Sequence, residues 1–341
     1  MNNPPFTITI KIANLTAEIA EQIGKIQGAG EYKRSLHVRK VNRLRSIQSS
    51  TAIEGNTLSL EQITAVINGK RILGNPREIK EVQNAYETYE RMLEFDPFNL
   101  KDFLFAHSLL TGGLVKESGV FRSGNAGVLS GRQIVHLGAR PRFVPGLVKE
   151  LFDWAKNSDI HPLIKSSVVH FEIEFIHPFA DGNGRIGRLW QTLMLANWHE
   201  LFAWIPTETI ICQNQADYYS VLGNAEKTAD STEFIEFMLE AIFTALSELP
   251  VNKITDIFPD KITDNIPDKI TDILSKTEKE FLRSIIGFLE NNGEIDNYRA
   301  QALTNKSAES VKKYFAALIK AGILTASGTN KGRKYKLVSV F

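Results

Sequence analysis

The feature that most constrains the fold of this chain is a segment, residues 162–176, that is apolar on nearly every side of a helix. Its apolar residues are Leu163, Ile164, Val168, Val169, Phe171, Ile173, Phe175 and Ile176. A helix without a polar face has no side to turn toward water, so it lies in the middle of a domain. The sequence therefore predicts a mainly α-helical domain built around this segment, with His177 at its C-terminal end.

The loop that follows this helix has the composition of an anion-binding site. Residues 177–188 read His-Pro-Phe-Ala-Asp-Gly-Asn-Gly-Arg-Ile-Gly-Arg. Gly182 and Gly184 allow positive φ values around Asn183, so that successive backbone N–H groups can turn toward one point. Just before the N-terminus of a helix, which we expect near Gly184, such an arrangement binds phosphate oxygens.

Charged and titratable side chains flank this turn on both sides. Arg185 and Arg188 are three residues apart on one helical face, close enough to hold the same polyphosphate. Asp181 is an oxygen ligand of the kind that shares Mg²⁺ with substrate phosphates. His177 can take a proton from a hydroxyl near neutral pH. The twelve residues together predict a site for a nucleoside triphosphate, a metal ion and a general base.

A second pattern in the same helix suggests zinc chemistry, and the cysteine content excludes it. His170 and Glu172 are spaced as in the zinc deaminases, whose site also needs a pair of cysteines. Cys212 is the only cysteine of the chain. We therefore interpret His170 as a core or surface histidine.

At residues 177–188 the chain resembles the Fic-domain proteins, whose signature is HxFx(D/E)GNGRxxR. Every fixed position is matched, by His177, Phe179, Asp181, Gly182, Asn183, Gly184, Arg185 and Arg188. The resemblance covers about residues 60–245, and it implies a Fic-type helical bundle with a small β-hairpin flap. Phe179 is then the apolar anchor of the motif in the core and not a catalyst.

The resemblance also implies an activity, the transfer of AMP from ATP to a Ser, Thr or Tyr hydroxyl of a target protein, with release of pyrophosphate. By this likeness His177 deprotonates the hydroxyl and Asp181 holds Mg²⁺ on the phosphates. The resemblance implies that Gly182, Asn183 and Gly184 bind the nucleotide and stabilise the developing charge, and that Arg185 and Arg188 hold the outer phosphates. It also implies a nucleotide contact for Asn214, which lies in a stretch similar to the family's Asn-x-x-x-Tyr-Tyr region beside the adenosine pocket.

A second stretch, residues 50–56, resembles the inhibitory-helix motif (S/T)xxxE(G/N) of this family. Ser50 and Glu54 stand in its fixed places, ahead of the Fic core, as in the subclass that carries its inhibitor at the N-terminus. The resemblance implies that Glu54 forms a bidentate pair with Arg188 and occupies the guanidinium that the γ-phosphate needs. ATP would then bind in a pose that is wrong for attack.

The helical pattern is interrupted at residues 119–144, where Gly, Ser and Asn residues separate the apolar residues Val128, Ile134 and Val135. This predicts a small hairpin. Residues 126–138 match the position of the family's flap, which implies that they dock an extended segment of the target protein by strand addition. The preceding residues 119–122, Gly-Val-Phe-Arg, are similar to a recurring Fic segment, and we expect a structural role for them.

The C-terminal part of the chain looks like a separate small domain. Three predicted helices and a hairpin with a basic tip are typical of a winged helix-turn-helix, and its basic residues suit DNA or protein contact equally. The domain organisation predicted is residues 1–60 with the inhibitory helix, 61–250 as the Fic catalytic core, 251–275 as a linker that repeats Lys-Ile-Thr-Asp, and 276–341 as the winged-helix domain.

Two other functions use the same features. The site could remove AMP from a protein, with Glu54 orienting a water molecule, or the Fic core could sense a nucleotide for a DNA-binding regulator. The resemblance further suggests self-modification and a homodimer, although the sequence does not indicate which surface would form the dimer. A net charge of +1, no signal-like N-terminus and no long apolar run predict a cytoplasmic protein without a membrane span.

Overall fold

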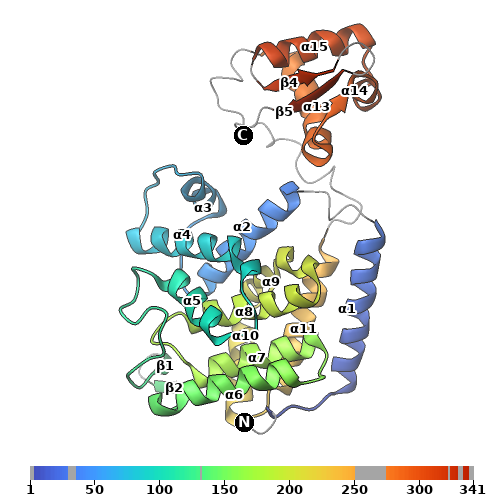
Figure 1. Ribbon diagram of the computed structural model, residues 1–341. Helices are drawn as coiled ribbons and strands as arrows, with labels where there is room; N and C mark the ends of the chain where they lie inside the picture. The colour runs from blue at the N-terminus through green and yellow to red at the C-terminus, as the bar shows by residue number, and fades with distance from the viewer. Residues whose placement is uncertain are drawn as a thin grey trace. The chain divides into compact units, whose positions relative to one another are not determined.

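A computed structural model of the chain describes residues 4–29, 36–130, 133–249, 274–321, 323–328 and 333–337 (Figure 1). The linker with its repeats, expected at residues 251–275, lies outside the described residues except for its last two. The chain divides into two compact units. Unit 1 comprises Met1–Lys25 and Lys40–Leu249, and unit 2 comprises Ile26–Arg39 and Pro250–Phe341.

Unit 1 is built almost entirely of helices, as the sequence predicts. The first helices of the chain are α1 (Ile10–Ala29), α2 (Leu36–Ile53), α3 (Leu60–Ile67), α4 (Pro76–Glu90) and α5 (Leu100–Thr111). They are followed by α6 (Val144–Asn157), α7 (Pro162–Ile176), α8 (Asn183–Trp198), α9 (Thr207–Gln213), α10 (Gln215–Thr228) and α11 (Thr232–Ser247). Short 3-10 turns at Met92–Glu94, Pro141–Phe143 and Glu200–Trp204 connect some of them.

Helix α7 is the central helix of unit 1, which confirms the prediction from its apolar circumference. It packs against α6, α8 and α11, and nearly all of its residues are buried (Figure 1). The loop after it enters the core through Phe179, whose ring lies 5.3 Å from that of Phe103 on α5. Phe103 in turn contacts Trp190 of α8 at 5.0 Å. This aromatic cluster fixes the loop between α7 and α8 to the middle of the bundle.

The hairpin predicted at residues 126–138 is present as β1 (Gly127–Ser130) and β2 (Gln133–Leu137). The strands pair antiparallel, with Gly127 opposite Leu137 and an irregular register between Val128 and Leu129. Below the strands, the N–H of Gly138 donates to the carbonyl of Ala126 at 3.1 Å and closes the hairpin base. Residues 131 and 132 at its tip lie outside the described part of the chain.

Unit 2 contains the predicted helices and hairpin. They are α13 (Lys276–Asn292), α14 (Asn297–Thr304), α15 (Ala308–Lys320), β4 (Leu324–Ser327) and β5 (Lys334–Leu337). A strand not expected from the sequence, β3 (Ile295–Asp296), pairs with β5 and gives an antiparallel sheet in the order β3-β5-β4. Phe315 of α15 stacks on Tyr335 of β5 at 3.7 Å in the core of this unit. The winged-helix assignment stays a prediction.

The two units have no helix in their described residues that is long and apolar enough to cross a membrane.

Candidate active site

His177 directly follows α7 and ends it with a left-handed conformation, at φ 52°. Its N–H donates to the carbonyl of Ile173 at 3.0 Å, so it is the last residue tied to the helix. A non-glycine residue in this region is disfavoured by about 1–2 kcal/mol, and other contacts must hold it. One of them is Arg122, whose Nε donates to the His177 carbonyl at 2.6 Å.

Asn183 closes the loop that starts at His177. Its side-chain Oδ1 accepts from the N–H of Phe179 at 2.9 Å, and its Nδ2 donates to the carbonyl of the same residue, also at 2.9 Å. Both ends of the amide are therefore used inside the protein, and Asn183 is buried. The side chain of Asn183 therefore holds the shape of the loop.

A histidine that the sequence analysis missed supports the same loop. His107 of α5 is buried, and its ring stacks on Phe179 with 3.6 Å between centroids. Its Nδ1 accepts from the N–H of Gly119 at 3.0 Å, so the proton is on Nε2, which donates to the carbonyl of Asp181 at 2.9 Å. Burial lowers the pKa of His107 to about 4, and the ring is neutral at physiological pH.

Helix α8 begins at the loop with its first-turn N–H groups directed out of the helix end. Gly182 precedes it at φ 86°, and among the described residues no side chain caps this terminus. A Cβ on Gly182 would lie 2.8 Å from the Thr111 side chain, so both the conformation and the space require glycine. An uncapped helix N-terminus of this kind binds anions through its backbone and dipole.

Asp181 and Arg185 face one another at this terminus. Arg185 is buried and donates to Asp181 Oδ1 at 2.9 Å and, through its other amino group, to Glu81 of α4. The second oxygen of Asp181 lies 3.2 Å from Nη2 of Arg77. The guanidinium predicted to hold phosphates is thus paired with two carboxylates, and Glu81 and Arg77 are further residues that the sequence analysis missed.

Asp181 has the chemistry to hold a metal ion whose other ligands are the phosphates of a bound nucleotide. Its side chain is 39% exposed, and its present partners are side chains of Arg77 and Arg185 that could exchange it for phosphate oxygens. Within the described ranges no group of three or more His, Cys, Asp or Glu could hold a metal ion alone. One carboxylate plus substrate phosphates is the usual coordination of Mg²⁺.

Arg188 and Glu54 form an ion pair, with Nη2 and Oε1 2.7 Å apart. The pair has this one contact and is not bidentate as expected. Nη2 also donates to the Ser50 carbonyl at 3.0 Å, and Nε lies 3.2 Å from the Ser50 hydroxyl. Burial opposes the charge of Arg188, but Glu54 raises its pKa. A Cβ on Gly184 would overlap the Glu54 carboxylate, so glycine is required for this approach.

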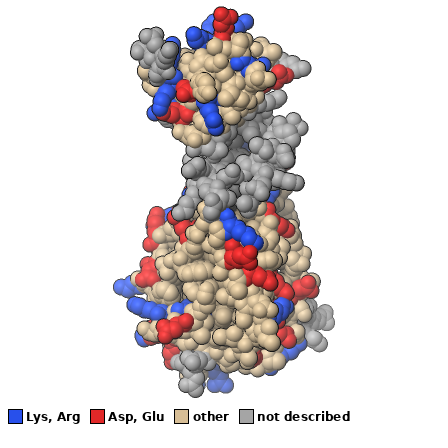
Figure 2. All heavy atoms as spheres, turned by 90° about the vertical axis from the view of Figure 1, so that its right-hand side faces the viewer, with Lys and Arg blue, Asp and Glu red and all other residues tan. Residues whose placement is uncertain are grey.

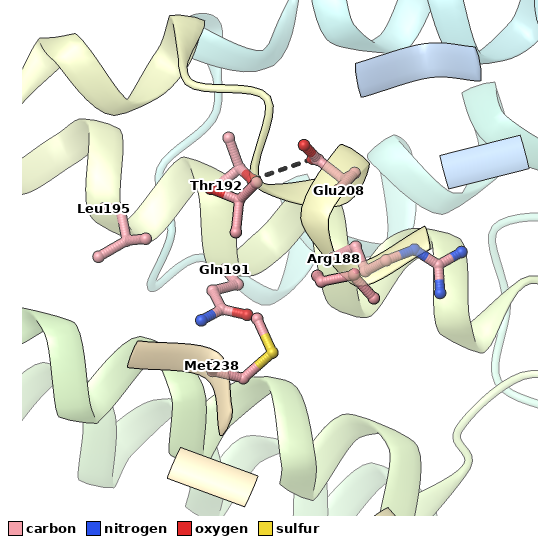
Figure 3. A pocket seen from close by; sticks show the side chains of 8 residues that line it. Arg188, Gln191, Thr192, Leu195, Glu208 and Met238 are labelled. Carbon is pink, nitrogen blue, oxygen red and sulfur yellow. Dashed lines mark hydrogen bonds between the residues drawn. The ribbon is translucent and has the colours of Figure 1, made fainter. Parts of the chain in front are cut away.

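Helix α2, which carries Ser50 and precedes Glu54, is docked through polar groups. Ser46 donates to Glu208 Oε2 at 2.8 Å, and the other oxygen of Glu208 accepts from Tyr89 at 2.8 Å and Thr192 at 3.2 Å. Figure 3 shows Glu208 and Thr192 beside Arg188, around a cavity of about 10 Å³, which is room for one water molecule. Ser46 thus joins α2 to α9, and Glu208 is held in turn by α4 and α8.

The side chain of Asn214 is hydrogen-bonded within its own segment. It is exposed between α9 and α10, and its Nδ2 donates back to the carbonyl of Ile210 at 2.9 Å. The neighbouring Tyr219 donates to the carbonyl of Ile53 at 3.3 Å, at the end of α2. Tyr218 is buried, with its hydroxyl 3.2 Å from Nε2 of His170. His170 is therefore a core histidine, and the adenosine contact of Asn214 stays a prediction.

Comparisons with known proteins agree with this geometry. Residues 97–195 match the Fic/DOC family. The crystal structure of a Fic family protein from Desulfovibrio desulfuricans G20 is 40% identical, covers 99% of this chain and 98% of its own, and superposes with a TM-score of 0.72. A structure of Fic-1 from Caenorhabditis elegans, 24% identical with a TM-score of 0.54, shares the fold over 69% of the chain.

Curated relatives are similar over part of their length. Protein adenylyltransferase Fic of Nematostella vectensis is 28% identical over 204 residues, 56% of this chain and 45% of that protein. Protein adenylyltransferase fic-1 of Caenorhabditis elegans is 27% identical over 205 residues, 56% of this chain and 38% of that protein. The chain spans less than half of these two relatives. With a solved relative matched over nearly its whole length and every signature position filled, the chain belongs to the Fic family.

Proposed function

We propose that this protein transfers AMP from ATP to a Ser, Thr or Tyr hydroxyl of a target protein and releases pyrophosphate. The observation that carries the proposal is the placement of the 177–188 motif, with His177 at the end of the central helix, directly ahead of the uncapped N-terminus of α8. The names of the curated relatives support adenylyl transfer, and they do not support removal of AMP.

In the proposed reaction the target hydroxyl attacks the α-phosphorus of ATP. The O–H bond breaks as the new O–P bond forms, and His177 takes the proton. The bond from the α-phosphorus to the bridging oxygen breaks, and pyrophosphate leaves with the electron pair. The N–H groups of Gly182, directly before α8, and of residues 183 and 184 in its first turn stabilise the charge that develops on the phosphate oxygens.

Arg185 and Arg188 would hold the phosphates by exchanging their present carboxylate partners. Asp181 would release Arg185 and Arg77 and hold Mg²⁺, which supplies positive charge to the phosphates when it is bound. Arg188 is buried, and a buried guanidinium without a partner is strongly destabilising. It is therefore paired either with Glu54, as in this structure, or with a phosphate.

The Glu54–Arg188 pair supports self-inhibition. Glu54 overlaps the space above Gly184, at the N-terminus of α8, where a phosphate would approach. The γ-phosphate of ATP and the Glu54 carboxylate then compete for one guanidinium. We propose that Glu54, held by α2, keeps ATP from binding in the reactive pose, and that Ser50 keeps Arg188 oriented toward it.

The test is labelling of protein by α-³²P-ATP with Mg²⁺ and a cell lysate as the source of target. We expect weak labelling by the wild type, strong labelling by Glu54→Gly, and none by the double variant His177→Ala/Glu54→Gly. Glu18→Gly, which removes an exposed glutamate of α1, is the matched control and should behave as the wild type. Absence of label in Glu54→Gly would contradict adenylyl transfer and favour a nucleotide sensor.

We propose a second function for unit 2, the binding of DNA. A groove lies between α14, α15 and β5, and its lining includes Tyr298, Lys312 and Arg333. Tyr298 is 81% exposed, and Lys312, Lys313 and Arg333 are exposed as well. Basic side chains on a helix and on an adjoining hairpin can contact phosphates on both sides of a duplex groove.

A further inference from the structure

Arg122 is a buried arginine whose partners are backbone carbonyls from three segments. It is 3% exposed. Its Nε donates to the carbonyl of His177 at 2.6 Å, its Nη1 to Gly124 at 2.8 Å, and its Nη2 to Ala139 and, at 3.5 Å, to Ile176. A guanidinium has five N–H donors in a planar arrangement, which allows one side chain to reach carbonyls in several directions.

Two of the carbonyls that Arg122 binds flank the hairpin, and the other two lie at the C-terminal end of α7. Gly124 precedes β1, and Ala139 follows β2, so the two enclose the hairpin. Ile176 and His177 are the last residue of α7 and the proposed base. Two backbone hydrogen bonds join the same segments, from Arg122 to Pro178 at 3.1 Å and from Ala139 to Ile176 at 3.3 Å.

Gly138 shows how closely these segments approach. A Cβ at this position would lie 2.9 Å from Nη2 of Arg122 and 2.9 Å from the Cβ of His177. The hairpin base therefore rests on the guanidinium and on the histidine at once. A side chain at residue 138 would displace one of them.

The charge of Arg122 is suited to this position. The last carbonyls of α7 have no partner within the helix, and the negative end of the helix dipole favours a cation there. Burial lowers the pKa of Arg122, but an arginine stays charged at any physiological pH. A lysine has its three donors at one point, so it can reach one segment but cannot span the carbonyls on both sides.

We propose that Arg122 is the positioning residue that fixes the target-docking hairpin relative to His177. It binds both ends of the hairpin and the carbonyl of the base, so a hydroxyl presented by a segment paired with the hairpin reaches the imidazole at a set distance. This rests on the proposed adenylyl transfer and on the expectation that the hairpin docks the target segment. The role of Arg122 is to align target and base, and it does not include binding of the nucleotide.

The test compares variants in the Glu54→Gly background. Arg122→Lys keeps the charge and leaves His177 uncrowded. Gly138→Ala keeps the guanidinium but crowds both it and the Cβ of His177, while Arg142→Lys changes an exposed arginine outside the cluster. Affinity for a non-transferable ATP analogue is measured by calorimetry, and the transfer rate at saturating ATP by single-turnover labelling. Hydrogen exchange of residues 124–139 and 176–178 is followed by mass spectrometry without any substrate.

We expect both cluster variants to bind the analogue within about twofold of the parent while the transfer rate falls about tenfold or more, because alignment and not binding is lost. Exchange should become faster in both segments together. Arg142→Lys should match the parent in all three measurements. A parental transfer rate, a parallel loss of affinity and rate, or faster exchange in one segment alone would each overturn the proposal.

Failure of the proposed function gives a different result. If Glu54→Gly itself transfers no AMP, adenylyl transfer is wrong. The exchange measurement still decides whether Arg122 couples the hairpin to the end of α7, because it requires no activity.

Discussion

Single side chains outside the signature hold its residues in place. His107 binds the backbone of Asp181 and stacks on Phe179, and Arg122 binds the backbone of His177. Each reaches the loop from a different part of the chain. In the proposed reaction the signature supplies the reacting groups, and these two residues hold the backbone that carries them.

The low pKa of His107 predicts a pH dependence of stability. The ring is neutral in the folded protein down to about pH 4, whereas in the unfolded chain it takes up a proton near its ordinary pKa of 6.5. The unfolded state therefore binds more protons in this window, and the stabilisation is lost as the pH falls from 6.5 toward 4. Between pH 7 and pH 5 this one group lowers the free energy of unfolding by about 2 kcal/mol.

His107→Phe tests this prediction, because it keeps an aromatic ring on Phe179 and removes the titration. The variant should be less stable than the wild type at pH 7, since the Asp181 carbonyl and the Gly119 N–H lose their partner. Its free energy of unfolding should fall less between pH 7 and pH 5. Urea unfolding followed by tryptophan fluorescence reports on unit 1, which contains Trp154, Trp190, Trp198 and Trp204, all four tryptophans of the chain. An equal pH dependence in both proteins would contradict the prediction.

At the scale of elements, α2 is held by apolar and by polar side chains. Leu44 and Ile47 of this helix lie in the hydrophobic core. Its buried polar residues include Asn42, Ser46, Ser49, Ser50 and Thr51. Hydrogen bonds of this kind contribute about 0.5–1.5 kcal/mol each when water can replace the partner, and more with a charged acceptor. Water can replace these hydrogen bonds when α2 leaves, whereas the burial of Leu44 and Ile47 opposes its release.

Ser46→Ala is predicted to raise AMP transfer although it leaves Glu54 in place. The hydroxyl of Ser46 donates to the buried carboxylate of Glu208, a bond to a charged group worth about 1.5–3 kcal/mol. When α2 moves as a unit, loss of the Ser46–Glu208 hydrogen bond shifts the equilibrium between docked and released α2 toward the released helix about tenfold or more. Labelling should lie between that of the wild type and that of Glu54→Gly.

Ser49→Ala is the matched control on the same helix. Its hydroxyl has a neutral partner, Thr209, at 3.2 Å, and a much smaller increase is expected. Equal labelling by the two serine variants would show that Glu208 does not hold α2.

What could be predicted from the sequence depends on how local the interactions are. The central helix and residues 177–188 were predictable, because the apolar pattern and the site residues are contiguous in the chain. The polar docking of α2 was not, since Ser46 and Glu208 are 162 residues apart and a serine-rich face usually indicates exposure to water. Glu81 and His107 were missed as site residues because each is a single side chain on its own helix, without a spacing that marks it. Arg122 was noticed only as part of the 119–122 segment, for which a structural role was expected.

At the scale of the whole molecule, positive and negative charges are mixed on both units. On the face of the protein in Figure 2, basic and acidic side chains are interspersed over unit 1 and over unit 2. The balance over the whole chain is close to neutral, with 40 Lys and Arg against 39 Asp and Glu. An electrostatic preference for nucleic acid therefore has to come from a local group of basic residues, and α15 with β5 supplies one in unit 2.

The double variant Lys312→Gln/Lys313→Gln tests DNA binding by the full chain. Both lysines are exposed on α15, and each phosphate contact that is lost should reduce the slope of log K against log salt by about 1. We expect weaker binding to a fluorescent duplex in anisotropy titrations at low salt, and a shallower salt dependence. Lys149→Gln/Lys156→Gln removes the same charge from exposed positions of α6 and should leave both quantities unchanged. If the wild type does not bind the duplex, or if the two double variants bind alike, α15 does not contact DNA, and a protein partner becomes the alternative for this groove.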